Sequence, residues 1–287
     1  MAIDAHQHPL FFRDFCADAQ IASLRREQQA YYKMGVQDVR RVIEQNRING
    51  VEKSILLPHD FSHFQNDRIS NDAMRQLVDR SEGAFYGFAA VDPNRDDAPA
   101  ELERAFGELG LSGLKLHLAK QKIAPSHMRV LALMEICQRY NKPVVFHAGI
   151  SWQPDATAQY ARPVFYEPIA VEFPKLRFSL AHMGFPWVTE TAALLAKYPN
   201  MYADLAALYF DSTDEFFHYL FDRAMDYTWL DRGIRHQVLF GTNSPRWGAK
   251  RALAAIRRLP LREETVECIT GRNALEFLGE EEVNWLD

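Results

Sequence analysis

The chain opens with Ile3-Asp4-Ala5-His6-Gln7-His8-Pro9, a short apolar run that ends in a pair of histidines. In an open doubly wound α/β sheet, the first strand usually leads into a glycine-rich loop that binds phosphate. Here the first run leads directly into His-Gln-His-Pro instead. This start favours a closed α/β barrel over an open sheet.

Short apolar runs alternate with helical patterns along the rest of the chain. The runs that read as strands are Ala2–His6, Val51–Leu57, Phe85–Val91, Gly113–Leu118, Pro143–His147, Arg177–Ala181, Met201–Leu205 and Gln237–Phe240. Strands that alternate with helices pair in parallel through right-handed crossovers. We therefore predict a single (β/α)₈ TIM barrel over residues 1–287, with an open doubly wound sheet as the competing architecture.

The stretches between the runs have apolar residues at the helical period. Gly50 is expected to end the first of these helices as a left-handed cap. Two connections, Asp14–Gly35 and Ile150–Glu167, are long for loops. We expect them to form lids or extra helices over the mouth of the barrel.

Composition places the chain among ordinary globular proteins, with 47% hydrophobic and 25% charged residues. Its cysteines, Cys16, Cys137 and Cys268, are odd in number and widely spaced. This pattern argues against a disulfide framework and against a thiolate metal site.

The net charge of -5 argues against a nucleic-acid partner, because phosphate binding requires a basic face. No apolar stretch is long enough to span a membrane, and no signal peptide is visible at the start. We expect a cytoplasmic protein with a small-molecule substrate. The sequence leaves the oligomeric state open, with a homo-oligomer as one option.

Four of the ten histidines stand at the ends of predicted strands. His6 and His8 are two residues apart, so their side chains should point to the same face. His147 ends the fifth run and His182 the sixth. The carboxyl ends of all strands meet at one face of a TIM barrel, where active sites lie. A single histidine is more often a hydrogen-bonded core residue, but four at one face indicate a metal site.

Several of these motifs occur in the order found in one known superfamily. They are Ile3-Asp4-Ala5-His6-Gln7-His8, Gly113-Leu114-Lys115-Leu116-His117, Pro143-Val144-Val145-Phe146-His147-Ala148-Gly149, Leu180-Ala181-His182-Met183-Gly184, Met201-Tyr202-Ala203-Asp204 and Leu239-Phe240-Gly241-Thr242-Asn243-Ser244-Pro245. The chain resembles the amidohydrolase superfamily, and within it the amidohydrolase-2 group with its aminocarboxymuconate-semialdehyde decarboxylase-like enzymes. The resemblance runs from Met1 to about Leu278.

The resemblance implies a role for each histidine. His6, His8 and His147 would bind one divalent metal ion, and we take zinc as that ion. His182 would orient or polarise the substrate or activate water, and His117 would line the catalytic site. The implied activity is metal-dependent hydrolysis of a small organic substrate, carboxylated or cyclic.

One position departs from the family pattern. The eighth strand of most members ends in an aspartate that binds metal and accepts a proton from water, whereas this chain has Asn243. An amide brings no negative charge and cannot act as a base. In order of preference, the chain is a hydrolase with His182 or another base, a decarboxylase or hydratase that needs no hydrolytic water, or a non-catalytic binding barrel.

Other residues of the motifs have two interpretations each. Lys115 is a substrate-binding candidate that could be carbamylated into a bridging ligand, as elsewhere in the superfamily. We favour a pairing of Lys115 with a carboxylate lower in the barrel. Asp204 and Asp92 are candidate partners for a metal-bound histidine, and Asp92 could equally serve an Asp-Pro turn. Gln121 either lines the site or is an exposed loop amide.

Loops that follow the strands supply candidate substrate contacts. Polar residues after the second strand are His59, Asp60 and His63. Aromatic and arginine residues after His147 and Asn243 are Trp152, Arg162, Tyr166, Arg246 and Trp247. Arginine binds carboxylates, and aromatic rings stack on flat substrates. We assign His59, Trp152, Arg162 and Arg246 to substrate binding, although the His59 loop could be solvated and the tryptophans could simply pack.

Overall fold

The computed structural model describes residues 1–16, 18–28 and 34–280. In these residues, eight strands form one sheet in sequence order, and each strand pairs in parallel with the next. The strands are β1 (Ile3–Gln7), β2 (Lys53–Leu56), β3 (Phe85–Ala90), β4 (Gly113–Leu116), β5 (Val144–Phe146), β6 (Phe178–Leu180), β7 (Met201–Asp204) and β8 (Val238–Leu239). Every predicted strand is present, with ends that differ by a few residues.

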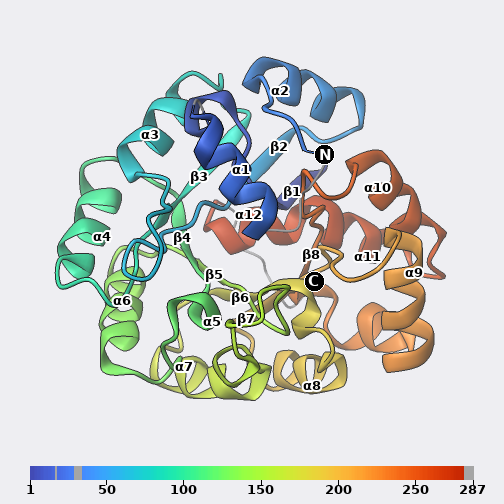
Figure 1. The fold of residues 1–287 in the computed structure, drawn as a ribbon. Coiled ribbons are helices and arrows are strands. Elements are labelled where there is room, and N and C mark those ends of the chain that lie inside the picture. Colours follow the sequence, from blue (N-terminus) through green and yellow to red (C-terminus); the bar gives the residue numbers. More distant parts are fainter. Residues whose placement is uncertain (17, 29–33, 281–287) are drawn as a thin grey trace.

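The sheet closes on itself where the segment after β8 meets β1. The Ala5 amide donates to the Phe240 carbonyl at 2.9 Å, and the His8 amide donates to the Ser244 carbonyl at 2.8 Å. Gly241 permits this approach, because a Cβ there would lie 2.9 Å from the Cβ of His6. Helices surround the strands in a ring (Figure 1). The predicted (β/α)₈ TIM barrel is confirmed.

Twelve α-helices lie in the described residues. They are α1 (Ala19–Gln28), α2 (Val39–Ile48), α3 (Asn71–Asp79), α4 (Ala98–Gly107), α5 (Leu118–Gln121), α6 (Met128–Arg139), α7 (Glu167–Glu172), α8 (Val188–Lys197), α9 (Thr213–His218), α10 (Ala249–Arg258), α11 (Glu263–Glu267) and α12 (Asn273–Leu278). Most of them belong to the ring, whereas α1, α5 and α12 lie across the barrel (Figure 1). Gly50 follows α2 with a φ of +86°, the left-handed conformation that the sequence predicted. No helix in the described ranges is long and apolar enough to cross a bilayer.

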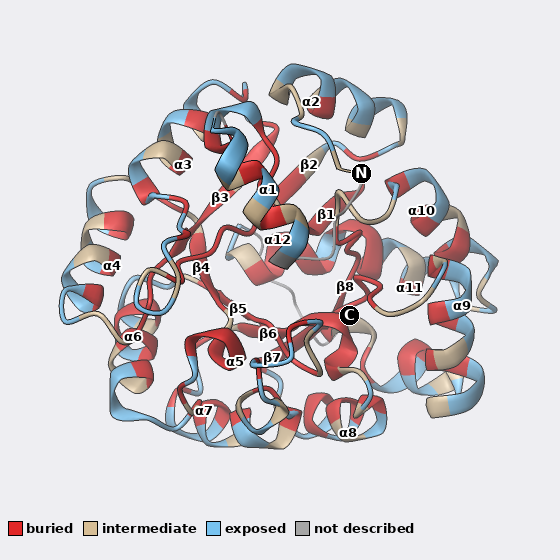
Figure 2. Ribbon diagram, in the orientation of Figure 1, coloured by how far each residue is buried: buried red, intermediate tan, exposed pale blue. Residues whose placement is uncertain are grey.

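Burial follows the layers of the barrel, since the strands are buried and the outer faces of the helices are exposed (Figure 2). An apolar cluster fills the barrel interior, with Ile55, Phe88 and Tyr202 among its members, and Phe277 of α12 packs into it. Arg177, which immediately precedes β6, donates to the Phe277 carbonyl at 2.8 Å. Helix α12 therefore covers the end of the barrel where the strands begin, and leaves the opposite end for a site.

An irregularity in β1 sets the direction of the first histidine. Asp4 pairs with Ser54 and Gln7 pairs with Leu56, so β1 contains one residue more than β2 over this stretch. Such a bulge interrupts the alternation of side chains. Two consecutive side chains therefore both face the inside of the barrel. Ala5 packs in the inner apolar cluster, and His6, the next residue, contacts the Asp204 carboxylate.

The first long connection contains α1, which a buried arginine holds to the barrel mouth. Nη1 of Arg25 donates to the carbonyls of Leu10 and Phe15 at 2.7 and 2.8 Å. The second connection contains short 3₁₀ turns at Ala158–Tyr160 and Pro163–Tyr166. Residues 17 and 29–33 of the first connection lie outside the described residues.

Candidate active site

His6 and His8 lie side by side at the open end of the barrel. Nδ1 of His6 lies 2.8 Å from Oδ2 of Asp204, and Nδ1 of His8 lies 3.0 Å from the Leu57 carbonyl. Both partners are acceptors, so both rings carry their proton on Nδ1 and present an unprotonated Nε2. Burial holds the pKa of both imidazoles well below the ordinary value, so the rings are neutral.

The two Nε2 atoms face each other at 3.1 Å. Two unprotonated nitrogens cannot form a hydrogen bond. If the proton of either ring moved from Nδ1 to Nε2, the lone pair of that Nδ1 would face the Asp204 carboxylate or the Leu57 carbonyl instead. Nitrogens that bind one zinc ion at about 2.0–2.1 Å in tetrahedral geometry are roughly 3.3–3.4 Å apart. The donor set of His6 and His8 therefore fits a shared metal cation.

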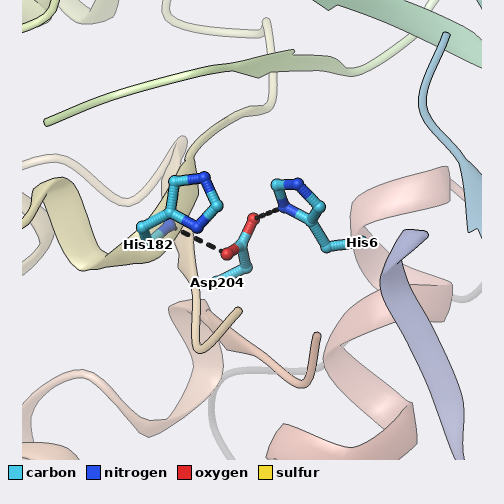
Figure 3. A group of neighbouring side chains, drawn as sticks. All are labelled: His6, His182 and Asp204. Atoms are coloured by element: carbon cyan, nitrogen blue, oxygen red, sulfur yellow. Dashed lines mark hydrogen bonds and ion pairs between the residues drawn. The ribbon is translucent and has the colours of Figure 1, made fainter. Parts of the chain in front are cut away.

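Asp204 at the end of β7 joins the histidines of two other strands (Figure 3). Its Oδ1 accepts from the amides of His182 and Ala206 at 2.9 and 3.1 Å, while Oδ2 accepts from His6. Donor atoms of His6, His182 and Asp204 lie within 4.8 Å of one another. Because both of its oxygens already accept hydrogen bonds, Asp204 is better suited to orienting His6 than to binding a metal itself.

His182 repeats the arrangement of His6 and His8. Its Nδ1 donates to the Ala206 carbonyl at 2.7 Å, which leaves Nε2 unprotonated. Burial lowers the pKa of His182 to about 3, so this ring is also neutral. The residue has a φ of +59°, a strained left-handed conformation of the kind that clusters at active sites.

His147 lies in the same group of rings with the opposite arrangement. Its Nε2 lies 3.2 Å from the Ile150 carbonyl, so Nδ1 is the nitrogen without a proton. The ring stacks on His117 at a centroid distance of 3.9 Å and lies 5.1 Å from the His182 ring. A ligand role for His147 stays a prediction, because the ring would bind a metal through Nδ1 or after releasing Ile150.

A pocket at this end of the barrel encloses about 700 Å³, including the part that opens to solvent. Its lining residues are His8, Leu10, Pro58, His59, Asp60, Phe61, Lys115, His117, Lys120, Gln121, His147, Ser151, Trp152, Gln153, His182, Leu208, Asn243 and Arg246. Most of the sequence-predicted residues are among them. Sequence reasoning missed Phe61, in the loop after β2, and Lys120, in the short helix α5, because no motif singles them out.

Several residues lie differently from the sequence expectation. Nζ of Lys115 is buried and has no hydrogen-bond partner among the described residues. The carboxylate whose charge acts on Lys115 is Asp204 at the end of β7, rather than one lower in the barrel as expected. Arg162 is exposed and pairs with Glu190 at 2.9 Å, outside the pocket lining. Asp92 accepts from the amide of Asn94 at 3.0 Å, which is a turn contact.

Two further polar residues of the pocket are held by buried partners. Oε1 of Gln121 accepts from the His117 amide at 3.2 Å, so this side chain supports the loop after β4. Nε2 of His59 lies 2.8 Å from Oδ2 of Asp67. Nη2 of Arg25 lies 2.8 Å from Oδ1 of the same carboxylate. The His59 loop is therefore a buried, paired element of the pocket wall.

Comparison with known families bears directly on this site. The family model described as Amidohydrolase matches residues 3–279, nearly the whole chain. The chain belongs to the amidohydrolase family. The strand-end histidines of this amidohydrolase thus lie on the scaffold that their motifs indicated.

Similar proteins and solved structures match this chain at low identity. A stretch of 69 residues is 29% identical to Protein fluG of Emericella nidulans and covers 24% of this chain but only 8% of that protein. A TIM-barrel protein from Bordetella bronchiseptica has a TM-score of 0.75 at 18% identity, over 97% of this chain and 98% of that one. The 5-carboxyvanillate decarboxylase of Novosphingobium aromaticivorans, complexed with manganese and 4-hydroxy-3-methoxy-5-nitrobenzoic acid, has a TM-score of 0.66 at 14% identity, over 97% and 96%.

Asn243 is integrated into the amidohydrolase pocket through its amide group. Nδ2 donates to the Ala207 carbonyl at 3.1 Å, and Nε1 of Trp247 donates to the same oxygen at 3.0 Å. The residue has a φ of +54°, a conformation that asparagine tolerates. The local structure specifies an amide donor at this position, because a carboxylate oxygen would face the Ala207 oxygen.

An Asn243→Asp variant is therefore expected to be less stable at neutral pH, without a gain in metal affinity. Loss of the hydrogen bond and an unpaired carbonyl should lower the free energy of unfolding by roughly 1–3 kcal/mol. Urea unfolding measures this loss. In acid the new carboxyl group is protonated and can donate to Ala207, so the difference from wild type should shrink. Equal stability together with tighter metal binding would show that Asn243 is only a lost ligand.

Proposed function

We propose that this amidohydrolase is a metal-dependent lyase that removes a carboxyl group from a small organic acid. The observation that carries the proposal is a pocket whose described lining contains cationic side chains and no carboxylate that is available to activate water. Asn243 supplies an amide at the position where the family motif has an aspartate that can accept a proton. Asp60, the one acidic residue of the described lining, accepts from Arg95 through Oδ2 and from Ser62 through Oδ1.

The cationic side chains of the lining support an anionic substrate. Lys115, Lys120 and Arg246 line the pocket, and Asp60 is the one acidic residue of the described lining. The decarboxylase of Novosphingobium aromaticivorans, which has the same fold, binds manganese and a substituted benzoic acid. An acid with a flat ring would also suit the rings of Phe61, His117 and Trp152 in this pocket.

The metal would be held by Nε2 of His6 and His8, with His147 completing the set. A donor set of imidazoles suits zinc better than manganese, which prefers oxygen ligands. When bound, the ion would act as a Lewis acid toward a substrate oxygen. Asp204 keeps the His6 proton on Nδ1, and thereby keeps Nε2 free for this role.

The side chains of the pocket would bind the negative charge of the substrate carboxylate and supply the proton that bonds to the product carbon. The ammonium of Lys115 binds the reacting carboxylate, and unprotonated Nε2 of His182 accepts a hydrogen bond from a substrate hydroxyl. The carbon–carbon bond to the carboxylate breaks, CO₂ leaves, and the electron pair stays on the substrate carbon. A proton then bonds to that carbon, and the ammonium groups of Lys115 and Lys120 are its source in the pocket.

Isotope incorporation tests this reaction class. Zinc-loaded protein is incubated with a panel of carboxylated phenols and with matched esters and lactones, in D₂O and separately in H₂¹⁸O. Decarboxylation places deuterium on the product carbon and releases CO₂, and it introduces no ¹⁸O into the organic product. Product carrying ¹⁸O would contradict the proposal. Chelator-treated protein is the control for metal dependence.

Hydrolysis is the second candidate function, and the free Nε2 of His182 favours it. In that case His182 would accept a proton from water, and ¹⁸O would appear in the product. Metal binding without turnover of any substrate in the panel would instead indicate a binding barrel. The same experiment therefore separates the three interpretations of Asn243.

A further inference from the structure

Asp4 is a buried carboxylate of β1 that lies outside the described lining of the pocket. Its Oδ1 accepts from the amides of His6 and Thr242, each at 3.0 Å, and its Oδ2 accepts from the Thr242 hydroxyl at 2.5 Å. Hydrogen bonds of this kind compensate a buried carboxylate for its loss of water. Asp4 therefore joins the first histidine of the site to the residue just before Asn243.

The first of these contacts holds the backbone of His6. The His6 amide lies inside the bulge of β1 between Asp4 and Gln7, and the Asp4 side chain is its acceptor. The ring of His6 is held separately, since its Nδ1 lies 2.8 Å from Oδ2 of Asp204. Two buried carboxylates thus fix His6, one through the backbone and one through the ring. The direction of Nε2 depends on both.

The second contact holds the turn that carries Asn243. The Thr242 hydroxyl donates to Asp4 and accepts from the Ser244 amide at 3.0 Å, so it bridges the two sides of Asn243. The Ser244 carbonyl in turn accepts from the His8 amide at 2.8 Å. The backbone of His8 is therefore connected to the same carboxylate that holds the backbone of His6.

We propose that Asp4 is a positioning residue for the metal centre, and that it acts through the Thr242 hydroxyl and the His6 amide. This inference rests on the proposed function, in which Nε2 of His6 and of His8 share one ion. Asp4 sets the separation of these two nitrogens, because it connects the backbones of both histidines across the seam between β1 and the segment after β8. Groups that orient metal ligands in this way typically contribute roughly 10–100-fold to metal affinity.

Metal titration of the full chain tests this role without any need for turnover. Thr242→Val keeps the shape of the side chain but removes the hydroxyl, and the Kd for zinc should rise about tenfold or more. Thr242→Ser keeps the hydroxyl and should bind zinc within about twofold of wild type. Co²⁺ accepts the same imidazole donors, so the visible absorption of the cobalt-loaded protein reports the geometry of the site. This absorption should change in Thr242→Val and should be retained in Thr242→Ser.

Asp4→Asn tests the other end of the same hydrogen bond. Whichever way the new amide is turned, one of the donors loses its acceptor, so the loss of zinc affinity should be similar to that of Thr242→Val. The Asp4→Asn, Thr242→Val double variant should lose little more affinity than either single variant, because both substitutions act through one contact.

Thr265→Val is the matched control for general destabilisation. The Thr265 hydroxyl donates to Oδ1 of Asp231 at 2.7 Å, a buried threonine–aspartate contact outside the described pocket lining. Its zinc affinity and cobalt absorption should equal those of wild type. The proposal is wrong if Thr242→Val also retains both, if Thr242→Ser loses as much as Thr242→Val, or if Thr265→Val loses as much. Retention in Thr242→Val leaves the metal centre intact, whereas a wild-type chain that binds no zinc overturns the centre and with it the role of Asp4.

Discussion

A His8→Ala variant is expected to lose its bound metal, with affinity reduced by more than about 100-fold. Loss of a group that merely orients a metal ligand already costs roughly 10–100-fold. His8 supplies one of two unprotonated Nε2 atoms that face each other at 3.1 Å, and no other described contact explains this pair. Removing one imidazole leaves His6 alone in that position, which cannot hold the ion there.

Metal content measured by mass spectrometry after zinc loading and gel filtration checks this expectation. His218→Ala is the matched control, since His218 is an exposed imidazole that pairs with Asp222 on the outer surface. Circular dichroism establishes that both variants fold. Stoichiometric zinc in His8→Ala would place the ion elsewhere and would remove the basis for the proposed metal centre.

An Asp67→Asn variant is expected to lower the free energy of unfolding by about 3–5 kcal/mol. The carboxylate of Asp67 pairs with Arg25 and His59, and all three side chains are buried. Without it, the guanidinium of Arg25 stays buried with no counter-charge. The change should also loosen α1 at the mouth, because Arg25 holds that helix to the barrel.

Denaturant unfolding at pH 7 measures the effect. Asp96→Asn is the matched control, because Asp96 is exposed and pairs with Arg129 on the surface, where such pairs contribute about 0–1 kcal/mol. An Asp67→Asn, Arg25→Met double variant removes both charges and should recover much of the loss. A loss from Asp67→Asn no larger than that of the control would contradict the assigned role.

The buried cluster of Asp67, Arg25 and His59 also predicts that the free energy of unfolding depends on pH. Burial alone would favour the neutral acid, but His59 and Arg25 outweigh it and hold the pKa of Asp67 below its ordinary value. A carboxyl group whose pKa is lowered in the folded state stabilises the protein above its unfolded pKa of about 3.9. The contribution is lost as the pH falls below that value, so wild type and Asp67→Asn should converge in strong acid.

The order of strands and the grouping of histidines could be predicted from local pattern alone. Each strand is a short apolar run, and the carboxyl ends of parallel strands meet at one end of a barrel. His8, His147 and His182 therefore line one pocket even though they stand far apart in the chain. Asn243 was equally visible as a departure from the family motif.

Tertiary structure alone decided which nitrogen of each imidazole is free and which charges are paired. The free Nε2 of His6 depends on Asp204, 198 residues away, and that of His8 depends on the Leu57 carbonyl. The amide donation of Asn243 to Ala207 is likewise a property of the closed barrel, as is the burial of Lys115 without a hydrogen-bond partner among the described residues. Periodicity within a strand determines which face a side chain occupies. Hydrogen bonding and charge compensation depend instead on what the neighbouring strands bring to that face.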